Sequence, residues 1–272
     1  MCAACHAQSE SVKRVPPFWE PSRLHGSGPI EVAQGFHRLT NGVSNFYLIE
    51  ADGNLILVDA GTPRDWDVFA HAASTLGRNL KQLAAILLTH AHPDHTGFAE
   101  RGRTDAGATV WIHEADAQVA KGGMLGKNEG WILPYFVYPE AWRTLFRLGR
   151  RGGTKLIPIL EVSTFADGQT IEVPGRPRAI HVPGHTPGMA SVFFEQRRVL
   201  LTGDCLVTKN PLTGRKGPQV MPSALNIDTG EALRSLSALE EIRAQVILPG
   251  HGEAWTEGPR EAVRLARDAA RS

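Results

Sequence analysis

The chain has 272 residues, and its 29 lysines and arginines nearly balance its 28 aspartates and glutamates, which leaves a formal net charge of +1. This length is near the upper limit for one domain and allows a large core. The near-neutral balance, without a long run of one sign, argues against a nucleic-acid partner. No apolar stretch reaches the length of a membrane span, so no membrane partner is expected either.

The amino-terminal residues and the cysteines bear on location. Residues 1–10 lack the charged start and apolar stretch of a secretion signal, so a cytoplasmic location is expected. The three cysteines are an odd number, which argues against a disulfide framework. The run Cys2-Ala3-Ala4-Cys5-His6 matches the C-x-x-C-H pattern of haem attachment, but that attachment normally needs export. A short irregular start is therefore the favoured interpretation, and the oligomeric state stays open, a homodimer included.

The amino-terminal part of the chain predicts an irregular arm followed by strands. Residues 1–28 contain several prolines and glycines, so we expect an arm there and one folded domain over 29–272. Thr62 and Pro63 are typical of a helix start and predict a helix over 64–76. Short apolar runs separated by hairpin-turn dipeptides predict strands at 30–32, 36–39, 46–49 and 55–58.

The remainder of the chain predicts a second group of strands and more helices. Apolar runs predict strands at 84–88, 108–112, 170–173, 178–182, 191–194, 199–201 and 245–248. Helical patterns and capping residues predict helices at 113–121, 139–148, 229–242 and 259–270. Residues 206–223 are rich in proline, glycine and basic residues and predict a loop. Two groups of strands, each followed by helices, indicate an α/β or α+β fold with a layered core.

Residues 122–160 form the most aromatic part of the chain. Glycines flank a run of large apolar side chains that ends in several arginines. An amphipathic helix packed on the core would explain this pattern. A lid insertion over an active-site cleft would explain it too, because ligand pockets are mostly apolar and flanking glycines would let the segment shift.

The stretch from Thr89 to Phe98 carries the strongest chemical signal. His90, His92, Asp94 and His95 lie within six residues, directly after an apolar strand. Two residues that are two apart in an extended strand face the same side, so the rings of His90 and His92 share a side. Pro93 ends the strand, and Asp94 and His95 then begin a helix and point at a second position. This spacing suits two metal ions roughly 3.5–4 Å apart.

This stretch resembles the H-x-H-x-D-H signature of the metallo-β-lactamase superfamily. Three later motifs resemble the family's other ligand loops and occur in the same order: Pro183-Gly184-His185-Thr186-Pro187-Gly188, Leu201-Thr202-Gly203-Asp204 and Pro249-Gly250-His251-Gly252. Upstream, residues 55–61 resemble the family's strand that ends in D-x-G. The resemblance covers roughly residues 30–255. It implies an α+β fold, a four-layer αβ/βα sandwich of two mostly antiparallel sheets with helices outside and the metal site at one edge.

The resemblance also implies two metal sites. His90, His92 and His185 would hold the first ion, and Asp94, His95 and His251 would hold the second. Asp204 would bridge the two ions. Asp59, at the end of its strand, would keep the ligand loops in orientation. Imidazole and carboxylate ligands suit two divalent ions, zinc first, with iron or manganese as alternatives.

Such a site implies a metal-dependent hydrolase. A hydroxide bridging the two ions would attack the substrate, so no separate nucleophile is needed. Asp204 and Asp94 are the predicted catalytic carboxylates, and Asp94 could orient the hydroxide or pass its proton to the leaving group. The aspartate at position 204 makes the set resemble glyoxalase II, lactonases and related thioesterases. We therefore expect cleavage of an ester, thioester or lactone bond in a small, partly apolar molecule.

Other activities and the substrate contacts stay open at this point. An amide hydrolase like the β-lactamases, an iron-dependent sulfur dioxygenase and a phosphodiesterase are the alternatives on the same fold. Tyr135, Phe136 and Tyr138 are the predicted apolar wall of the substrate site. Lys209 could hold a substrate carboxylate or phosphate, although a solvated loop charge explains it more simply.

Overall fold

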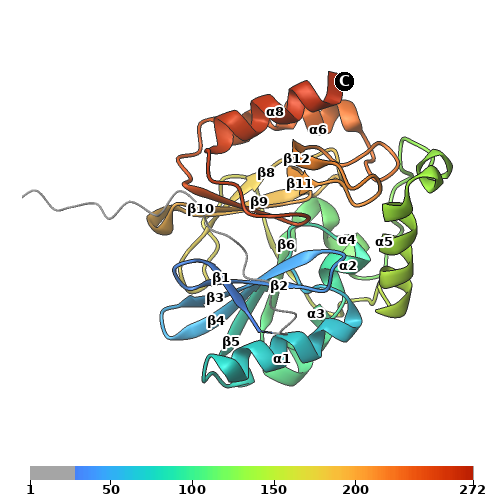
Figure 1. The fold of residues 1–272 in the computed structure, drawn as a ribbon. Coiled ribbons are helices and arrows are strands. Elements are labelled where there is room, and N and C mark those ends of the chain that lie inside the picture. Colours follow the sequence, from blue (N-terminus) through green and yellow to red (C-terminus); the bar gives the residue numbers. More distant parts are fainter. Residues whose placement is uncertain (1–27, 272) are drawn as a thin grey trace, which may run out of the picture.

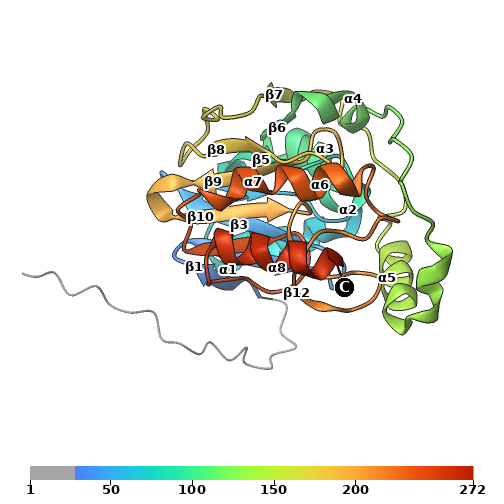
Figure 2. The same ribbon diagram turned by 90° about the horizontal axis from the view of Figure 1, so that it is seen from above.

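A computed structural model describes residues 28–271 of the chain, drawn in Figure 1. The C-x-x-C-H run and nearly all of the expected amino-terminal arm lie outside the described residues. The described part forms four layers, with two β-sheets face to face and helices on the outer side of each sheet (Figures 1 and 2). This arrangement is the predicted sandwich.

The first sheet has seven strands that follow one another in chain order. Its first four strands pair antiparallel and its last three join in parallel. The expectation of a mostly antiparallel sheet is therefore wrong for this sheet, because helical crossovers separate its later strands, and such connections favour parallel pairing. The strands are β1 Ile30–Ala33, β2 Phe36–Thr40, β3 Asn45–Ala51, β4 Asn54–Val58, β5 Leu83–Leu87, β6 Thr109–His113 and β7 Ser163–Phe165.

The second sheet has four strands in the order β13-β10-β9-β8, and a two-stranded ribbon, β11-β12, lies beside it. The ribbon corrects the predicted loop over 206–223. Asn210 Oδ1 accepts hydrogen bonds from the amides of Leu212 and Thr213, and this closes a hairpin in the glycine-rich stretch. The strands are β8 Arg178–His181, β9 Ala190–Phe194, β10 Val199–Gly203, β11 Val207–Lys209, β12 Lys216–Gln219 and β13 Val246–Pro249.

The helices lie mainly outside the two sheets. α1 and α3 cover the first sheet, whereas α6, α7 and α8 cover the second (Figures 1 and 2). The predicted helix over 229–242 is interrupted at Leu236, where one short helix ends and the next begins. The helices are α1 Trp66–Thr75, α2 Pro93–Thr96, α3 Ala99–Arg101, α4 Ala117–Ala120, α5 Pro139–Arg150, α6 Thr229–Ser235, α7 Ser237–Glu240 and α8 Pro259–Arg271.

Three apolar layers hold the sandwich together. The central layer contains side chains from both sheets, among them Phe36 and Phe194, whose rings meet edge to face at 5.2 Å. A second layer fills the space between the first sheet and α1, around Phe69. The third lies between the second sheet and α6 to α8, around Leu236. Burying both faces of each sheet leaves the strand ends as the place for polar groups.

One predicted strand is not formed. Residues 170–173 make only an isolated bridge from Thr170 to Arg178. Within this run, the amide of Val173 donates to the carbonyl of Ile171, so the chain turns back on itself instead of continuing extended. The short strand β7 takes the edge position next to β6 instead, and the sequence did not predict it.

Helix α5 stands at the side of the sandwich, away from both helical layers (Figures 1 and 2). It lies where the predicted helix over 139–148 was expected, within the aromatic segment 122–160. None of the helices within 28–271 combines the length and apolarity that a membrane span requires.

Candidate metal centre

The predicted metal ligands come from loops at the ends of four strands. His90 and His92 follow β5, and Pro93 then begins α2, where its missing amide hydrogen costs no bond. His185 follows β8, Asp204 follows β10 and His251 follows β13. Because these strand ends lie at one edge of the sandwich, residues that are far apart in the chain meet there.

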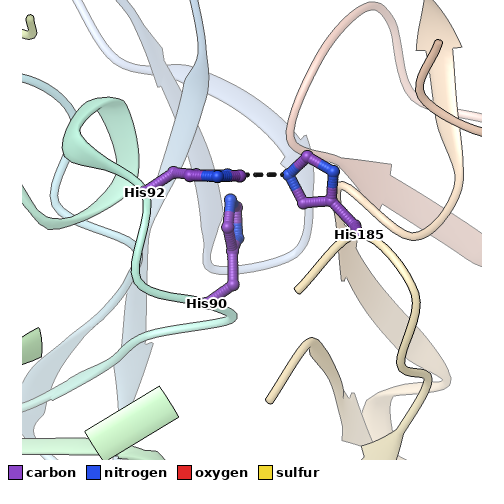
Figure 3. Close-up of side chains that lie close together, drawn as sticks. All are labelled: His90, His92 and His185. Atoms are coloured by element: carbon purple, nitrogen blue, oxygen red, sulfur yellow. Dashed lines mark hydrogen bonds between the residues drawn. The ribbon is translucent and has the colours of Figure 1, made fainter. Parts of the chain in front are cut away.

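Three histidines form the first group (Figure 3). The rings of His90, His92 and His185 point toward one another, and their ring nitrogens lie within 4.8 Å of one another. His92 Nδ1 and His185 Nε2 are only 2.8 Å apart. This group is the set predicted for the first ion.

The second predicted set also comes together. Donor atoms of Asp94, His95 and His251 lie within 4.8 Å of one another. The distance from Asp94 Oδ2 is 3.7 Å to His95 Nε2 and 3.8 Å to His251 Nε2. Asp94 is partly exposed, whereas His95 and His251 are buried. A molecule approaching from solvent therefore reaches this group on its Asp94 side.

Asp204 lies between the two groups. Its Oδ2 atom is 3.1 Å from His251 Nε2 and 3.5 Å from the Nε2 atoms of both His95 and His185. The distance from the same oxygen to His90 Nε2 is 4.0 Å. One carboxylate thus contacts histidines of both groups, as expected for the residue predicted to bridge two ions.

Burial keeps the first group of histidines neutral. It lowers the pKa of His92, lowers the pKa of His185 to about 3 and, together with the neighbouring imidazoles, holds the pKa of His90 well below its usual value. A neutral imidazole keeps a nitrogen lone pair, which is the form that binds a metal ion.

The second group has a different charge state. Burial lowers the pKa of His95 and of His251, but the Asp204 and Asp94 carboxylates outweigh it and raise both pKa values. Burial raises the pKa of Asp204, yet His251 and His95 outweigh it, so that pKa lies well below its usual value. Asp204 is therefore ionised, and its buried negative charge needs positive charge beside it.

In the described part of the chain, three buried polar atoms of the cluster lack a hydrogen-bond partner, as is expected for atoms that bind metal ions. Across the described residues 28–271, His90 Nε2, His95 Nε2 and Asp204 Oδ1 are buried and make no hydrogen bond. Buried polar atoms are nearly always paired, so atoms like these in one cluster call for another partner. The donors are nitrogen and carboxylate oxygen, without thiolate, which suits zinc, iron or manganese. The residues present thus fit a pair of divalent ions.

Asp59 contacts one of the predicted ligand histidines, and its role in orienting the ligands stays a prediction. Its Oδ2 atom is 2.8 Å from His95 Nδ1, and its Oδ1 accepts the amide of Thr89 at 2.8 Å. Asp59 has a φ of 61°, in the left-handed region that non-glycine residues rarely adopt. Such backbone strain persists only where surrounding contacts enforce it, and it is common at functional sites.

Asp116 joins two ligand loops and was not predicted. Its buried carboxylate accepts the amide of Ala91 at 3.0 Å, next to His90 and His92. It also accepts the Thr186 hydroxyl at 2.8 Å and the Gly188 amide at 2.7 Å, on the turn that follows His185. In the sequence, Asp116 is only one acidic residue near a helix start, so nothing marks it out.

Asn226 is a second residue that the sequence did not reveal. Its Oδ1 atom is 3.0 Å from His185 Nδ1, and its side-chain nitrogen Nδ2 donates to the backbone carbonyl of Met221 at 2.7 Å. The second contact identifies Oδ1 as the side-chain atom that faces His185, which then donates from Nδ1 and keeps Nε2 free for a metal.

The loop of residues 41–44 supports the other side of the cluster. His251 Nδ1 donates to the carbonyl of Val43 at 2.7 Å, and the Ser44 hydroxyl donates to the carbonyl of Asp94 at 2.7 Å. Gly250 lets the chain pass close to this cluster, because a Cβ there would lie 2.1 Å from Asp204 Oδ1. Glycine is therefore required at position 250.

The predicted substrate residues lie on the aromatic segment and on β11. Tyr135 and Phe136 are partly buried and pack in a small cluster with Leu212 and Ala224. Tyr138 is 44% exposed. Lys209 Nζ is 2.5 Å from Glu140 Oε1, so its charge is shared with a carboxylate of α5. Substrate contact by these four residues, Tyr135, Phe136, Tyr138 and Lys209, stays a prediction.

Comparison with known families agrees with this fold and this cluster. The sequence model of the metallo-β-lactamase superfamily matches residues 39–251, which is most of the chain and spans every predicted metal ligand. The chain belongs to the metallo-β-lactamase superfamily.

Individual known proteins resemble the chain over most of its length. The probable metallo-hydrolase YflN of Bacillus subtilis (strain 168) is 26% identical over 260 residues, which cover 87% of this chain and 90% of YflN. The structure of the family protein TTHA1429 from Thermus thermophilus has a TM-score of 0.63 at 26% identity and covers 89% of this chain and 81% of that one.

A B3 metallo-β-lactamase with an active-site glutamic acid also has a TM-score of 0.63, and the match covers 89% of this chain and 88% of that one. At 18% identity, this second structure shows the fold alone. Family membership, together with the histidine and aspartate groups, supports a metal-dependent hydrolase.

Proposed function

We propose that this protein is a binuclear metal-dependent hydrolase that cleaves an ester, thioester or lactone bond of a small, partly apolar molecule. The observation that carries the proposal is the position of Asp204 between two three-residue groups, each able to hold one ion. His90, His92 and His185 would hold the first ion, and Asp94, His95 and His251 the second. Zinc is the ion we propose first, with iron or manganese as alternatives.

Two divalent ions, when bound, lower the pKa of coordinated water and polarise a substrate oxygen. The protein supplies the rest of the chemistry. Asp204 places one buried negative charge where both ion sites share it. Asp94 is partly exposed in the same cluster, so its carboxylate is within reach of a substrate and could orient the attacking group or relay its proton to the leaving group.

The choice of carbonyl substrates rests on the ligand set. Aspartate at position 204, with five histidines, resembles the sets of glyoxalase II and the lactonases. Partly buried aromatic side chains at positions 135 and 136 would favour an apolar acyl or ring portion. The polar cluster would then act on the carbonyl at one end of this portion.

The segment 122–160 contacts the loops on both sides of the cluster. Near its first end, the backbone amide of Glu129 donates to the backbone carbonyl of Asn226. The side chain of Asn226 in turn contacts His185. Near its other end, Arg147 donates to the carbonyl of Gly42, next to the residue that holds His251. These contacts support our proposal that the segment borders the substrate cleft as a lid.

A hydrolysis screen tests the proposal. The metal-loaded protein would be offered matched sets of lactones, thioesters, carboxylic esters, phosphoesters and β-lactams. We expect turnover of at least one of the first three classes and little or none of the last two. The variant His95→Ala is the matched negative control, because it should keep the fold and lose an ion. Turnover confined to phosphoesters or β-lactams would overturn the proposed substrate class.

A further inference from the structure

A group of arginines lies on α5 and beside it. Five arginines line one open cavity of about 660 Å³ next to the loop of residues 41–44. The cavity is within the size range of small-molecule sites. The arginines come from two regions of the chain and are Arg64, Arg143, Arg147, Arg150 and Arg151. We call this cavity the arginine pocket.

The arginine pocket concentrates positive charge in a chain whose net charge is only +1. Of its five guanidinium groups, Arg151 pairs with the buried Asp65 at 2.6 Å. Arg143 is 3.4 Å from Glu140, which is already paired with Lys209. The carboxylates therefore offset only part of the charge, and the like charges repel one another unless an anion joins them.

Two of these arginines are held in place by backbone carbonyls. Arg64 donates to the carbonyl of Arg150 at 2.7 Å, and Arg147 donates to the carbonyl of Gly42 at 3.1 Å. Each guanidinium has five N–H donors, so these contacts leave most donors available. Fixed guanidinium groups with free donors suit phosphate, which they bind through paired, charge-assisted hydrogen bonds.

The pocket also has an apolar wall. Phe146 lines it, is 66% exposed and lies under the guanidinium of Arg150, with 5.6 Å from that carbon to the ring centre. An exposed aromatic ring beside arginines can pack against the organic part of a phosphorylated molecule. The wall therefore points to a phosphorylated organic compound more than to a free inorganic ion.

The pocket adjoins the candidate metal centre through one loop. Asn41 lines the pocket, and its side-chain oxygen accepts the amides of Val43 and Ser44. The carbonyl of Val43 in turn accepts from His251. A ligand held by the arginines thus lies against the loop that supports a predicted metal ligand.

We infer that the arginine pocket binds the phosphate groups of a soluble small molecule, which anchor a thioester or ester substrate while its reactive bond lies at the metal centre. The role in anchoring a substrate rests on the proposed hydrolase function, whereas the phosphate site itself does not.

Direct binding tests the site. Calorimetry with inorganic pyrophosphate and with ADP would compare the wild type with the double variant R143Q/R150Q. These two side chains are suitable because Arg143 contacts Glu140 of its own helix and Arg150 lies on Phe146, so neither contact holds another segment of the described chain. The control is R176Q/R264Q, which removes two exposed, ion-paired arginines elsewhere and the same charge.

We expect each anion to bind the wild type and the control with the same affinity. Its affinity for the pocket variant should be lower by about tenfold or more, at unchanged metal content and melting temperature. Absent binding, or equal binding by all three proteins, would overturn the site. Sedimentation with phosphatidylglycerol vesicles separates a lipid source. Binding to such vesicles without binding to pyrophosphate or ADP would also overturn it and would assign the arginines to a membrane surface.

Kinetics test the anchoring role. Two thioesters with the same acyl group would be compared. One is the thioester of coenzyme A, a thiol compound that contains phosphate groups, and the other is the thioester of N-acetylcysteamine, which contains none. We expect R143Q/R150Q to raise KM about tenfold for the first and to leave the second unchanged. Equal effects on both would overturn the anchoring role while the hydrolase function stands. Hydrolysis of neither would contradict the thioester proposal, and the binding of pyrophosphate would still decide the site.

Discussion

At the scale of single residues, the chemistry depends on where carboxylates lie among histidines. The resemblance to the family's motifs predicted seven ligands, and the structure brings all seven residues together at one edge of the sandwich. Their role as ligands stays a prediction. Asp116 and Asn226 could not be predicted, because their role depends on contacts between loops that are distant in sequence. Short motifs record spacing along the chain but not these tertiary contacts.

Neighbouring residues at the end of β10 give a matched test of the ligand assignment. Asp204 faces the histidines, whereas the Cys205 thiol contacts Ser191 and Thr202, and burial raises its pKa to about 12. We expect Asp204→Ala to lose more than about a hundredfold in activity and Cys205→Ala to stay within a few fold of the wild type. Hydrolysis rates and metal content of both variants would be measured. Equal losses with unchanged folding and metal content would show that the assignment is wrong.

Asp116 offers a test of a residue that acts through the ligand loops. In Asp116→Asn, an NH2 group replaces one of the two oxygens that accept from Ala91, Thr186 and Gly188. We expect metal affinity to fall roughly 10–100-fold, because outer contacts of this kind orient ligands. Competition with a chelator measures this fall. Asp105→Asn, an exposed carboxylate on the surface, is the control. Unchanged affinity in Asp116→Asn would contradict the role.

At the scale of elements, apolar periodicity and capping residues predicted the buried strands and most helices correctly. The short edge strand β7 and the ribbon β11-β12 were not predicted. Strands buried on both faces, such as β4 and β5, lie where their apolar runs predicted them. The run 170–173 did not form a strand, because local hydrogen bonds turn it back after Ile171. The ribbon β11-β12 was missed because its strands are short and contain polar residues, glycine and proline, and because its turn rests on Asn210. Short edge elements depend on such local contacts more than on composition.

The aromatic segment gives a prediction at this scale. If Tyr135 and Phe136 line the substrate cleft, activity should rise with acyl chain length, because a longer chain buries more apolar surface. Replacing Phe136 by Ala should then raise KM for long acyl chains more than for short ones. Hydrolysis of a series of acyl esters, with Leu160→Ala as an exposed apolar control in the same segment, measures this. Independence of chain length in the wild type, or loss of stability alone in the variant, would assign the segment to packing.

At the scale of the whole molecule, the resemblance in the motifs predicted both the superfamily and the four-layer sandwich, and both are confirmed. The two sheets bury their faces in three apolar layers, so polar ligand loops gather at the strand ends. Helix α5 lies outside these layers, and the packing of the sandwich does not require the arginines on it. The substrate therefore has to be identified through features particular to this chain, the aromatic segment and the arginine pocket.

The measurement that tests the central claim most directly is the metal content of the intact protein. The seven predicted ligands form two groups that share Asp204, so each chain should hold two divalent ions. Elemental analysis would be made on protein purified without chelator and then dialysed after metal addition. We predict two ions per chain, and removal of Asp204 should reduce this number. One ion or fewer in the wild type, even after metal addition, would contradict the binuclear account.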